Sequence, residues 1–283
     1  MYPVFFEVPN WFPFLGGQPI TSFGVFMLLA FLTAGYVLRA ELRRVGEDPE
    51  KAWDFVFMAV VGGILGAKGY YILLNWPRLL DDPAGLVFSR GGLVWYGGFL
   101  LATALVIWEI RRQKLPVPAV ADLMAPALAL AYGVGRMGCF LVGDDWGLPT
   151  DSALGVRFPR GTPSSSVQNI EQMFGVTVDP ALVEKYGQVV PVHPTQLYEV
   201  GISTLIFFLL WRIRDHGHRK GWLFLLWLVL AGLERFAVEF LRAKDDRFFG
   251  VLTVAQIISL GIVAFGLAGL LRIRGTEATA EAA

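Results

Sequence analysis

Charge is scarce in this chain of 283 residues, of which 17% are charged, with 24 Lys and Arg matched by 24 Asp and Glu. Soluble domains average about 25% charged residues. A single cysteine excludes a disulfide framework and a multi-cysteine metal site, and three histidines argue against a histidine-rich one. Zero net charge excludes a basic nucleic-acid binder, and the apolar composition excludes a disordered chain.

The chain is rich in apolar residues: 55% of the residues are hydrophobic, and the mean hydropathy is +0.54. Seven runs with few or no charges are long enough to cross ~30 Å of hydrocarbon. They lie at 20–38, 53–75, 91–110, 117–142, 196–213, 221–242 and 250–272. The sequence therefore predicts an all-α, polytopic membrane protein with seven transmembrane helices in one domain, 1–275, and a disordered tail, 276–283.

Basic residues predict the orientation of these spans. If the N-terminus is outside, the inner segments 39–51, 111–114, 212–220 and 272–274 hold 13 Lys and Arg, and the outer segments hold 8. We therefore expect an N-out/C-in topology, with residues 143–195 forming a small extracytoplasmic head subdomain. No basic residue precedes Arg39, so the first run is expected to be a span and not a cleaved signal peptide.

Four charges inside the runs fall in the predicted outer half of the membrane: Lys68, Arg136, Arg235 and Glu239. Each costs about 2.5–3.5 kcal/mol there and by default marks function. Arg235 and Glu239, four residues apart, share a helix face. They form either a structural ion pair or an anion site in which Glu239 orients Arg235. Arg136 as a second arginine favours a phosphate ligand, because a guanidinium can bind two of its oxygens.

The segment GVGRMGCFLVGDDWG surrounds Arg136 with glycines, among them Gly143 and Gly147. Glycines allow either close helix packing or close approach of backbone to a ligand. Cys139 is interpreted as a small apolar residue, with an acyl-carrying nucleophile as the alternative.

The fifth run begins PVHPTQLYE, which predicts His193 as helix N-cap, Pro194 as the first helical residue and Gln196 reaching back to the cap. Capping does not explain Glu199, one turn into the membrane. Tyr96, which opens the third run, is either an interfacial aromatic or a hydroxyl that faces a cavity.

These blocks together resemble a known family: YGGF (96–99), GRMGCFLVGDDWG (135–147), HPTQLYE (193–199) and RFAVEFLR (235–242), in this order. They are similar to bacterial phosphatidylglycerol–prolipoprotein diacylglyceryl transferases. The resemblance implies a seven-span enzyme of the bacterial inner membrane, with its active site opening to the outer half. Such an enzyme moves the diacylglyceryl group of phosphatidylglycerol to the lipobox cysteine thiol of a prolipoprotein and releases glycerol 1-phosphate. The implied partners are phosphatidylglycerol, membrane lipids and prolipoprotein signal peptides with a lipobox cysteine. No metal, cofactor or nucleic acid is implied.

The resemblance also implies residue roles. The catalytic candidates are Arg136, Arg235, Tyr96 and His193. The substrate-binding candidates are Arg136, Arg235, Glu239, Asp144, Gly143, Gly147, Gln196, Glu199 and Lys68.

The chain departs from the family at several of these positions. Tyr96 and Cys139 stand where His and Asn are usual, and Asp144 stands where Glu is usual. Two tyrosines of the family are replaced by Phe23 and Ala231. The phosphate-handling charges are retained, whereas several hydrogen-bonding groups are lost.

Two alternatives follow. The first is a divergent relative that binds an anionic lipid with altered or no transferase activity. The second is a lipid or anion transporter, against which the nearly charge-free inner halves argue.

Overall fold

The computed structural model describes residues 2–11, 16–87, 89, 91–243, 247–248 and 252–281. Two of the predicted outer cations, Arg90 and Lys244, lie outside these residues. The chain forms two compact units, one of residues 1–33 and 125–283 and the other of residues 34–124.

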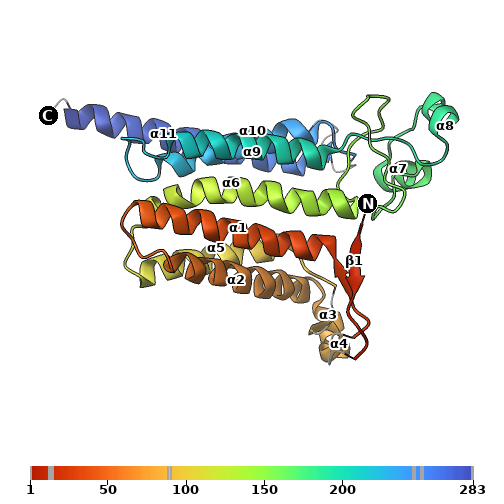
Figure 1. Ribbon diagram of the computed structural model, residues 1–283, viewed down its shortest axis with the longest axis horizontal. Helices are drawn as coiled ribbons and strands as arrows, with labels where there is room; N and C mark the ends of the chain where they lie inside the picture. The colour runs from red at the N-terminus through yellow and green to blue at the C-terminus, as the bar shows by residue number, and fades with distance from the viewer. Residues whose placement is uncertain are drawn as a thin grey trace. The chain divides into compact units, whose positions relative to one another are not determined.

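Long helices dominate both units, and each overlaps one of the seven apolar runs (Figure 1). They are α1 (Ser22–Arg44), α2 (Lys51–Leu74), α5 (Trp95–Arg112), α6 (Val117–Val142), α9 (Thr195–Ile213), α10 (Trp222–Glu239) and α11 (Val254–Glu281). Within the described chain, five are long and apolar enough to cross a membrane: α1, α2, α6, α9 and α11. The other two, α5 and α10, have 18 residues each and carry charges toward one end, so the structure supports five spans by length and composition, whereas the sequence predicts seven.

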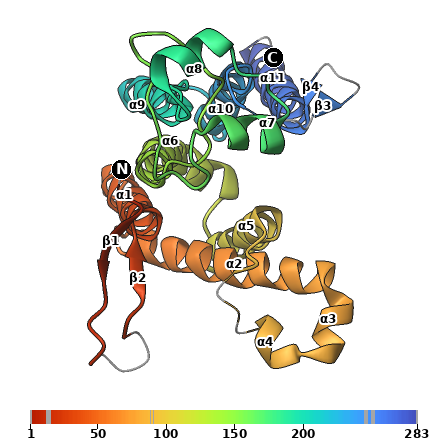
Figure 2. The same ribbon diagram turned by 90° about the vertical axis from the view of Figure 1, so that its right-hand side faces the viewer.

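The unit 34–124 is held together by α2 and α5, which approach closely at small residues. A Cβ on Gly66 would lie 2.2 Å from the Gly97 carbonyl oxygen, and one on Gly97 would lie 2.3 Å from that of Gly66. Helices in membranes pack through such contacts because small residues let the backbones meet. Two short helices, α3 (Trp76–Asp81) and α4 (Pro83–Val87), continue from the end of α2 (Figure 2).

In the other unit, α10 packs against both α9 and α11. An apolar cluster joins α6, α9 and α10 through Ala125, Ala129, Ile206, Leu210 and Leu223. This packing fixes the three helices that carry the buried charges.

Residues 143–195 fold around a buried apolar cluster that includes Trp146, Phe158, Ile170 and Val190. The segment contains the short helices α7 (Val167–Phe174) and α8 (Pro180–Tyr186). Ser166 caps α7 by accepting a hydrogen bond from the Asn169 amide. A core of its own makes this segment a structured element rather than a loose connection.

Two antiparallel strand pairs depart from the all-α prediction. They are β1 (Val4–Glu7) with β2 (Pro19–Thr21), and β3 (Arg247–Phe248) with β4 (Leu252–Thr253). Strands of two to four residues are too short to show an alternating pattern against an apolar background.

At the C-terminus, α11 extends to Glu281 and so covers most of the predicted disordered tail, 276–283. Six of the eight residues at 276–283 are alanine or glutamate, which are strong helix formers, and this explains the difference. Residues 282–283 lie outside the described residues.

Candidate functional site

Glu199, on the second turn of α9, is fully buried and holds two polar groups of α6. Arg136 donates from Nε to Glu199 Oε2 at 2.5 Å, and Tyr132 donates its hydroxyl hydrogen to Oε1 at 2.7 Å. A desolvated carboxylate requires such partners, since an unpaired buried charge costs several kcal/mol. This pairing joins α6 to α9.

Arg235 of α10 extends the same network. Its Nη2 lies 2.6 Å from Glu239 Oε2, as their four-residue spacing predicts. Its Nη1 lies 3.8 Å from Glu199 Oε1 and has no hydrogen-bond partner among the described residues. Glu199 therefore stands between two guanidinium groups, one of which keeps a buried donor for another acceptor.

Asp145 and Arg242 close the network on its other side. Arg136 Nη1 donates to Asp145 Oδ2 at 3.0 Å, and Arg242 Nη2 donates to Asp145 Oδ1. Arg242 Nε lies 3.5 Å from Glu239 Oε2. Six side chains thus form a closed charge ring in which every charge has two neighbours of opposite sign. In order around it, the ring contains Arg136, Glu199, Arg235, Glu239, Arg242 and Asp145.

Sequence reasoning identified four members of the charge ring and missed Asp145 and Arg242. Arg242 was assigned to the outer boundary of its span, although its spacing of three from Glu239 places both on one helix face. Glu234 was also missed. It is buried, and its Oε1 has no hydrogen-bond partner in the described part of the chain.

Asp144 lies beside the ring, and it is not part of it. Its backbone oxygen accepts a hydrogen bond from the Gln196 side chain, and its Oδ1 is buried without a hydrogen-bond partner among the described residues. Burial, helped by the neighbouring charge of Asp145, raises the pKa of the Asp144 carboxyl to about 6. Gly143 precedes it with a positive φ of 75°, a backbone conformation that favours glycine.

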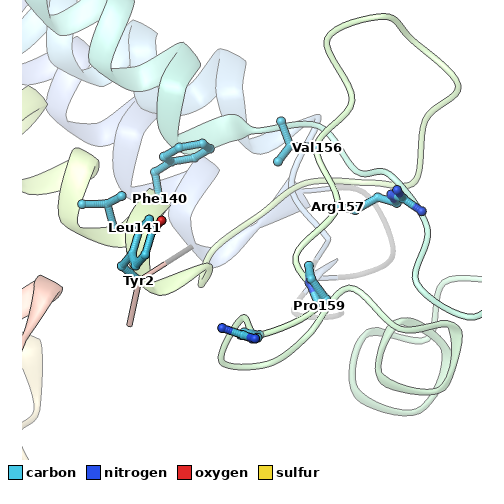
Figure 3. Close-up of a pocket in the computed structure, with 7 residues that line it drawn as sticks. Tyr2, Phe140, Leu141, Val156, Arg157 and Pro159 are labelled. Carbon is cyan, nitrogen blue, oxygen red and sulfur yellow. The ribbon is translucent and has the colours of Figure 1, made fainter. Parts of the chain in front are cut away.

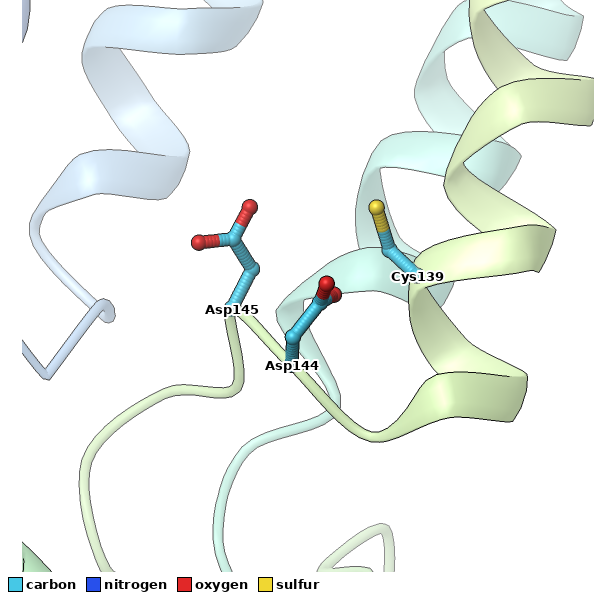
Figure 4. Close-up of side chains that lie close together, drawn as sticks. All are labelled: Cys139, Asp144 and Asp145. Carbon is cyan, nitrogen blue, oxygen red and sulfur yellow. The ribbon is translucent and has the colours of Figure 1, made fainter. Parts of the chain in front are cut away.

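Cys139, Asp144 and Asp145 gather their sulfur and oxygen atoms within 4.8 Å of one another (Figure 4). This spacing would suit a metal ion. Both Asp145 oxygens, however, accept hydrogen bonds from arginines, and Arg136 also donates to Cys139 Sγ at 3.5 Å. Because these guanidinium groups would repel a cation, the chemistry of the cluster does not favour a metal.

His193 does not cap α9 as the sequence predicts. The N-cap is Pro194, and the helix begins at Thr195. The backbone of His193 instead pairs with Gly147 and Leu148 in an extended arrangement, at 2.8 and 3.0 Å. Its Nδ1 lies 3.1 Å from the Tyr198 hydroxyl oxygen. Burial lowers the pKa of His193, which favours the neutral imidazole, the form that can accept a proton.

Lys68 and Tyr96 belong to the unit 34–124. Lys68 Nζ donates to the backbone oxygen and hydroxyl of Ser89, at 2.7 and 2.8 Å, and to the Gly91 oxygen at 3.1 Å. Its charge is thus used to tie a loop to α2. Tyr96 is 49% exposed and meets Trp95 edge-on, with ring centroids 5.3 Å apart.

Comparison with known proteins gives consistent matches over nearly the whole chain. A family model described as prolipoprotein diacylglyceryl transferase matches residues 9–272. A phosphatidylglycerol–prolipoprotein diacylglyceryl transferase of Clostridium tetani is 31% identical over 268 residues, which cover 94% of this chain and 96% of the relative. A transferase of the same name from Stenotrophomonas maltophilia is 34% identical over 273 residues, which cover 92% of this chain and 90% of the relative. Another from Vibrio atlanticus is 30% identical over 278 residues, which cover 93% of this chain and 91% of the relative.

Proposed function

Because this chain belongs to the prolipoprotein diacylglyceryl transferase family, we propose that it transfers the diacylglyceryl group of phosphatidylglycerol to the lipobox cysteine of a prolipoprotein. In this reaction the thiol sulfur forms a bond to the glyceryl carbon. The bond between that carbon and the phosphate oxygen breaks, and glycerol 1-phosphate leaves. The thiol proton passes to a base, and the leaving oxygen gains negative charge.

The observation that carries this proposal concerns Nη1 of Arg235, which is buried and lies at ion-pair distance from Glu199, the carboxylate that also holds Arg136. Among the described residues this Nη1 has no hydrogen-bond partner. A buried guanidinium donor without an acceptor is costly, and a phosphate oxygen would satisfy it. Arg235 and Arg136 would then stabilise the charge that develops on the leaving phosphate in a low-dielectric site. Glu199 and Glu239 would hold the two guanidinium groups in place.

The proton acceptor is either His193 or Tyr96. His193 lies six residues before Glu199 of the charge ring, in the segment that also carries Asp145. Burial lowers its pKa, which favours the neutral form that a proton acceptor needs. Tyr96 stands where the family usually has histidine. Gln196 and Asp144 would position the lipid headgroup, and Gly143 and Gly147 would let backbone approach it.

We also propose seven spans in a bacterial inner membrane, N-out/C-in, with residues 143–195 outside. The packing of α5 on α2 and of α10 on α11 supports counting both as spans. Arg136 lies near the end of α6 and Glu199 near the start of α9, and residues 143–195 join these two ends. The charge ring would therefore open to the outer half of the membrane, where lipid phosphates lie.

Two outcomes would favour the alternatives. A divergent relative would bind phosphatidylglycerol without transferring its diacylglyceryl group. A transporter would move a lipid or anion in vesicles without modifying a peptide. No described feature favours either alternative.

The test is transferase activity of the purified chain on a lipobox peptide, with phosphatidylglycerol as donor and phosphatidylcholine as comparison. We expect thioether formation with the first lipid only. Arg136→Lys keeps the charge and loses the two-oxygen fork, so activity should fall about 100-fold while the protein still folds.

Arg112→Lys is the matched control. Arg112 also forms a fork with a glutamate, Glu109, through Nε and Nη2 at 2.7 and 2.6 Å, but in the other unit. Its replacement should leave transfer unchanged. Equal activity of the Arg136→Lys variant and the wild type would overturn the assignment of Arg136 to the phosphate.

A further inference from the structure

A second candidate site lies outside the charge ring, at the last turn of α6. It is a pocket of about 520 Å³, within the usual range of ligand pockets. Phe140, Leu141 and Val156 give it an apolar wall, and Tyr2 adds an aromatic one (Figure 3). Arg157 and Arg160 complete the lining with Pro159.

The two arginines make this pocket cationic. Both are exposed, and neither forms an ion pair or side-chain hydrogen bond with another residue in the described part of the chain. No acidic residue is among the described residues that line the pocket. Figure 3 shows the Arg157 side chain directed away from Phe140, Leu141 and Tyr2, so this charge lies at the rim of the pocket. Positive charge without a counter-charge at the rim of an apolar wall suits a ligand that is anionic at one end and apolar at the other.

The pocket walls are held in place before any ligand arrives. Val156 exchanges two backbone hydrogen bonds of 3.0 Å with Val192. Phe158, between the pocket residues, is fully buried and packs edge-on against Phe140, with ring centroids 5.8 Å apart. The amide of Tyr2 donates to the Leu141 oxygen at 3.2 Å. A preformed pocket binds with less loss of conformational entropy than a mobile surface.

The place of the pocket fits a phospholipid. Phe140 and Leu141 lie on the last turn of a helix apolar enough to span the membrane, and α6 ends at Val142. The end of such a helix is where the hydrocarbon meets the phosphates. Arg136 lies five residues before Leu141, about 7.5 Å away along the helix axis.

We propose that this pocket captures an anionic phospholipid, whose headgroup is attracted by the positive charges of Arg157 and Arg160 at the rim and whose acyl region begins against Phe140, Leu141 and Val156. The pocket would supply the donor lipid to the charge ring, and this role rests on the proposed function. The capture itself requires only an anionic amphiphile at the membrane surface.

Native mass spectrometry of the full chain in detergent tests the capture. The protein is titrated with dioleoylphosphatidylglycerol, with dioleoylphosphatidylcholine and with inorganic phosphate. In Arg157→Gln with Arg160→Gln, we expect one bound phosphatidylglycerol fewer than in the wild type, or about tenfold weaker binding of it. Phosphatidylcholine retention should not change. The KM for phosphatidylglycerol in the transferase assay should rise, with kcat preserved.

Lys185→Gln is the control for a general loss of positive charge, because it removes an exposed cation of the same segment that does not line the pocket. Unchanged phosphatidylglycerol retention in the double variant would overturn the proposal. Displacement of the lipid by equimolar inorganic phosphate would show that the pocket binds free phosphate, and it would overturn the assignment of its ligand as a phospholipid. If the double variant loses phosphatidylglycerol while Arg136→Lys keeps full activity, the pocket proposal stands and the phosphate role of Arg136 fails. If the double variant keeps phosphatidylglycerol while Arg136→Lys loses activity, the phosphate role of Arg136 stands and the pocket proposal fails.

Discussion

One aspartate decides how the charge ring closes. Asp145 adopts a left-handed backbone conformation, with φ at 57°, and its two oxygens face Arg136 and Arg242. Aspartate tolerates this conformation better than most residues, at a cost of about 1 kcal/mol or more. The adjacent Asp144 turns its side chain toward Cys139 instead (Figure 4). The family resemblance places the acidic residue of this block on Asp144, and the backbone angle at Asp145 brings the second aspartate into the charge ring as well.

Asp144 should make stability depend on pH. Its folded pKa of about 6 lies above the ordinary value of 3.8 because burial disfavours the charged form. The folded state therefore binds this proton more tightly, and stability should rise as the pH falls from about 6 toward 4. At pH 7.5, Asp144→Asn should be more stable than the wild type by on the order of 1 kcal/mol, a figure reduced for partial exposure.

Thermal unfolding in detergent between pH 4 and 7.5 measures this difference. The gap between Asp144→Asn and the wild type should close toward pH 4, where both side chains are neutral. A gap that stays constant across the range would contradict the raised pKa.

The Arg235–Glu239 pair separates a structural role from a functional one. Arg235→Ala removes one of the two cations beside the buried Glu239 and leaves only Arg242, and it should cost about 3 kcal/mol of stability. Arg235→Leu with Glu239→Leu should recover most of that loss, because an apolar pair can replace a buried ion pair. It should not recover transferase activity, because the phosphate would lose one cation.

Both variants are compared by thermal unfolding and by the lipobox-peptide assay. An active double-leucine variant would mean that Arg235 only ties α10 into the bundle. That result would favour the structural interpretation of this ion pair.

At the scale of elements, residues 147–148 join two helices of the charge ring. Their backbone pairs with His193, just before α9, and with Leu241, just after α10. A Cβ on Gly147 would lie 2.3 Å from the Leu241 oxygen and 2.9 Å from His193 Cβ. Gly147→Ala should therefore displace backbone next to Arg242, cost about 1–3 kcal/mol and lower activity.

Gly201→Ala is its control, since Gly201 lies in α9 and a Cβ there would meet open space. That change should be neutral or stabilise the protein by about 0.5–1 kcal/mol, because alanine favours a helix. Thermal unfolding compares the two variants. Equal stability of the Gly147 and Gly201 variants would show that the backbone at 147 can move freely.

At the scale of the whole molecule, topology remains the main prediction. The excess of 13 over 8 basic residues favours an outer N-terminus. Reporter fusions at residues 48, 115 and 217 should score as cytoplasmic, and a fusion at 165 as extracytoplasmic. A cytoplasmic score at 165 would place residues 143–195 inside and would remove the outer opening of the charge ring.

The sequence alone determined the helical architecture, the family and the pairing of Arg235 with Glu239. Apolar length, motif spacing and the helical repeat are local properties of a chain, and they can be read without knowing what packs against what. Only the tertiary structure decided that Asp145 and Arg242 join the charge ring, that His193 pairs with residues 147–148, and that Lys68 holds a loop. Those outcomes depend on how residues distant in sequence meet and on one left-handed backbone angle, and no local pattern encodes either.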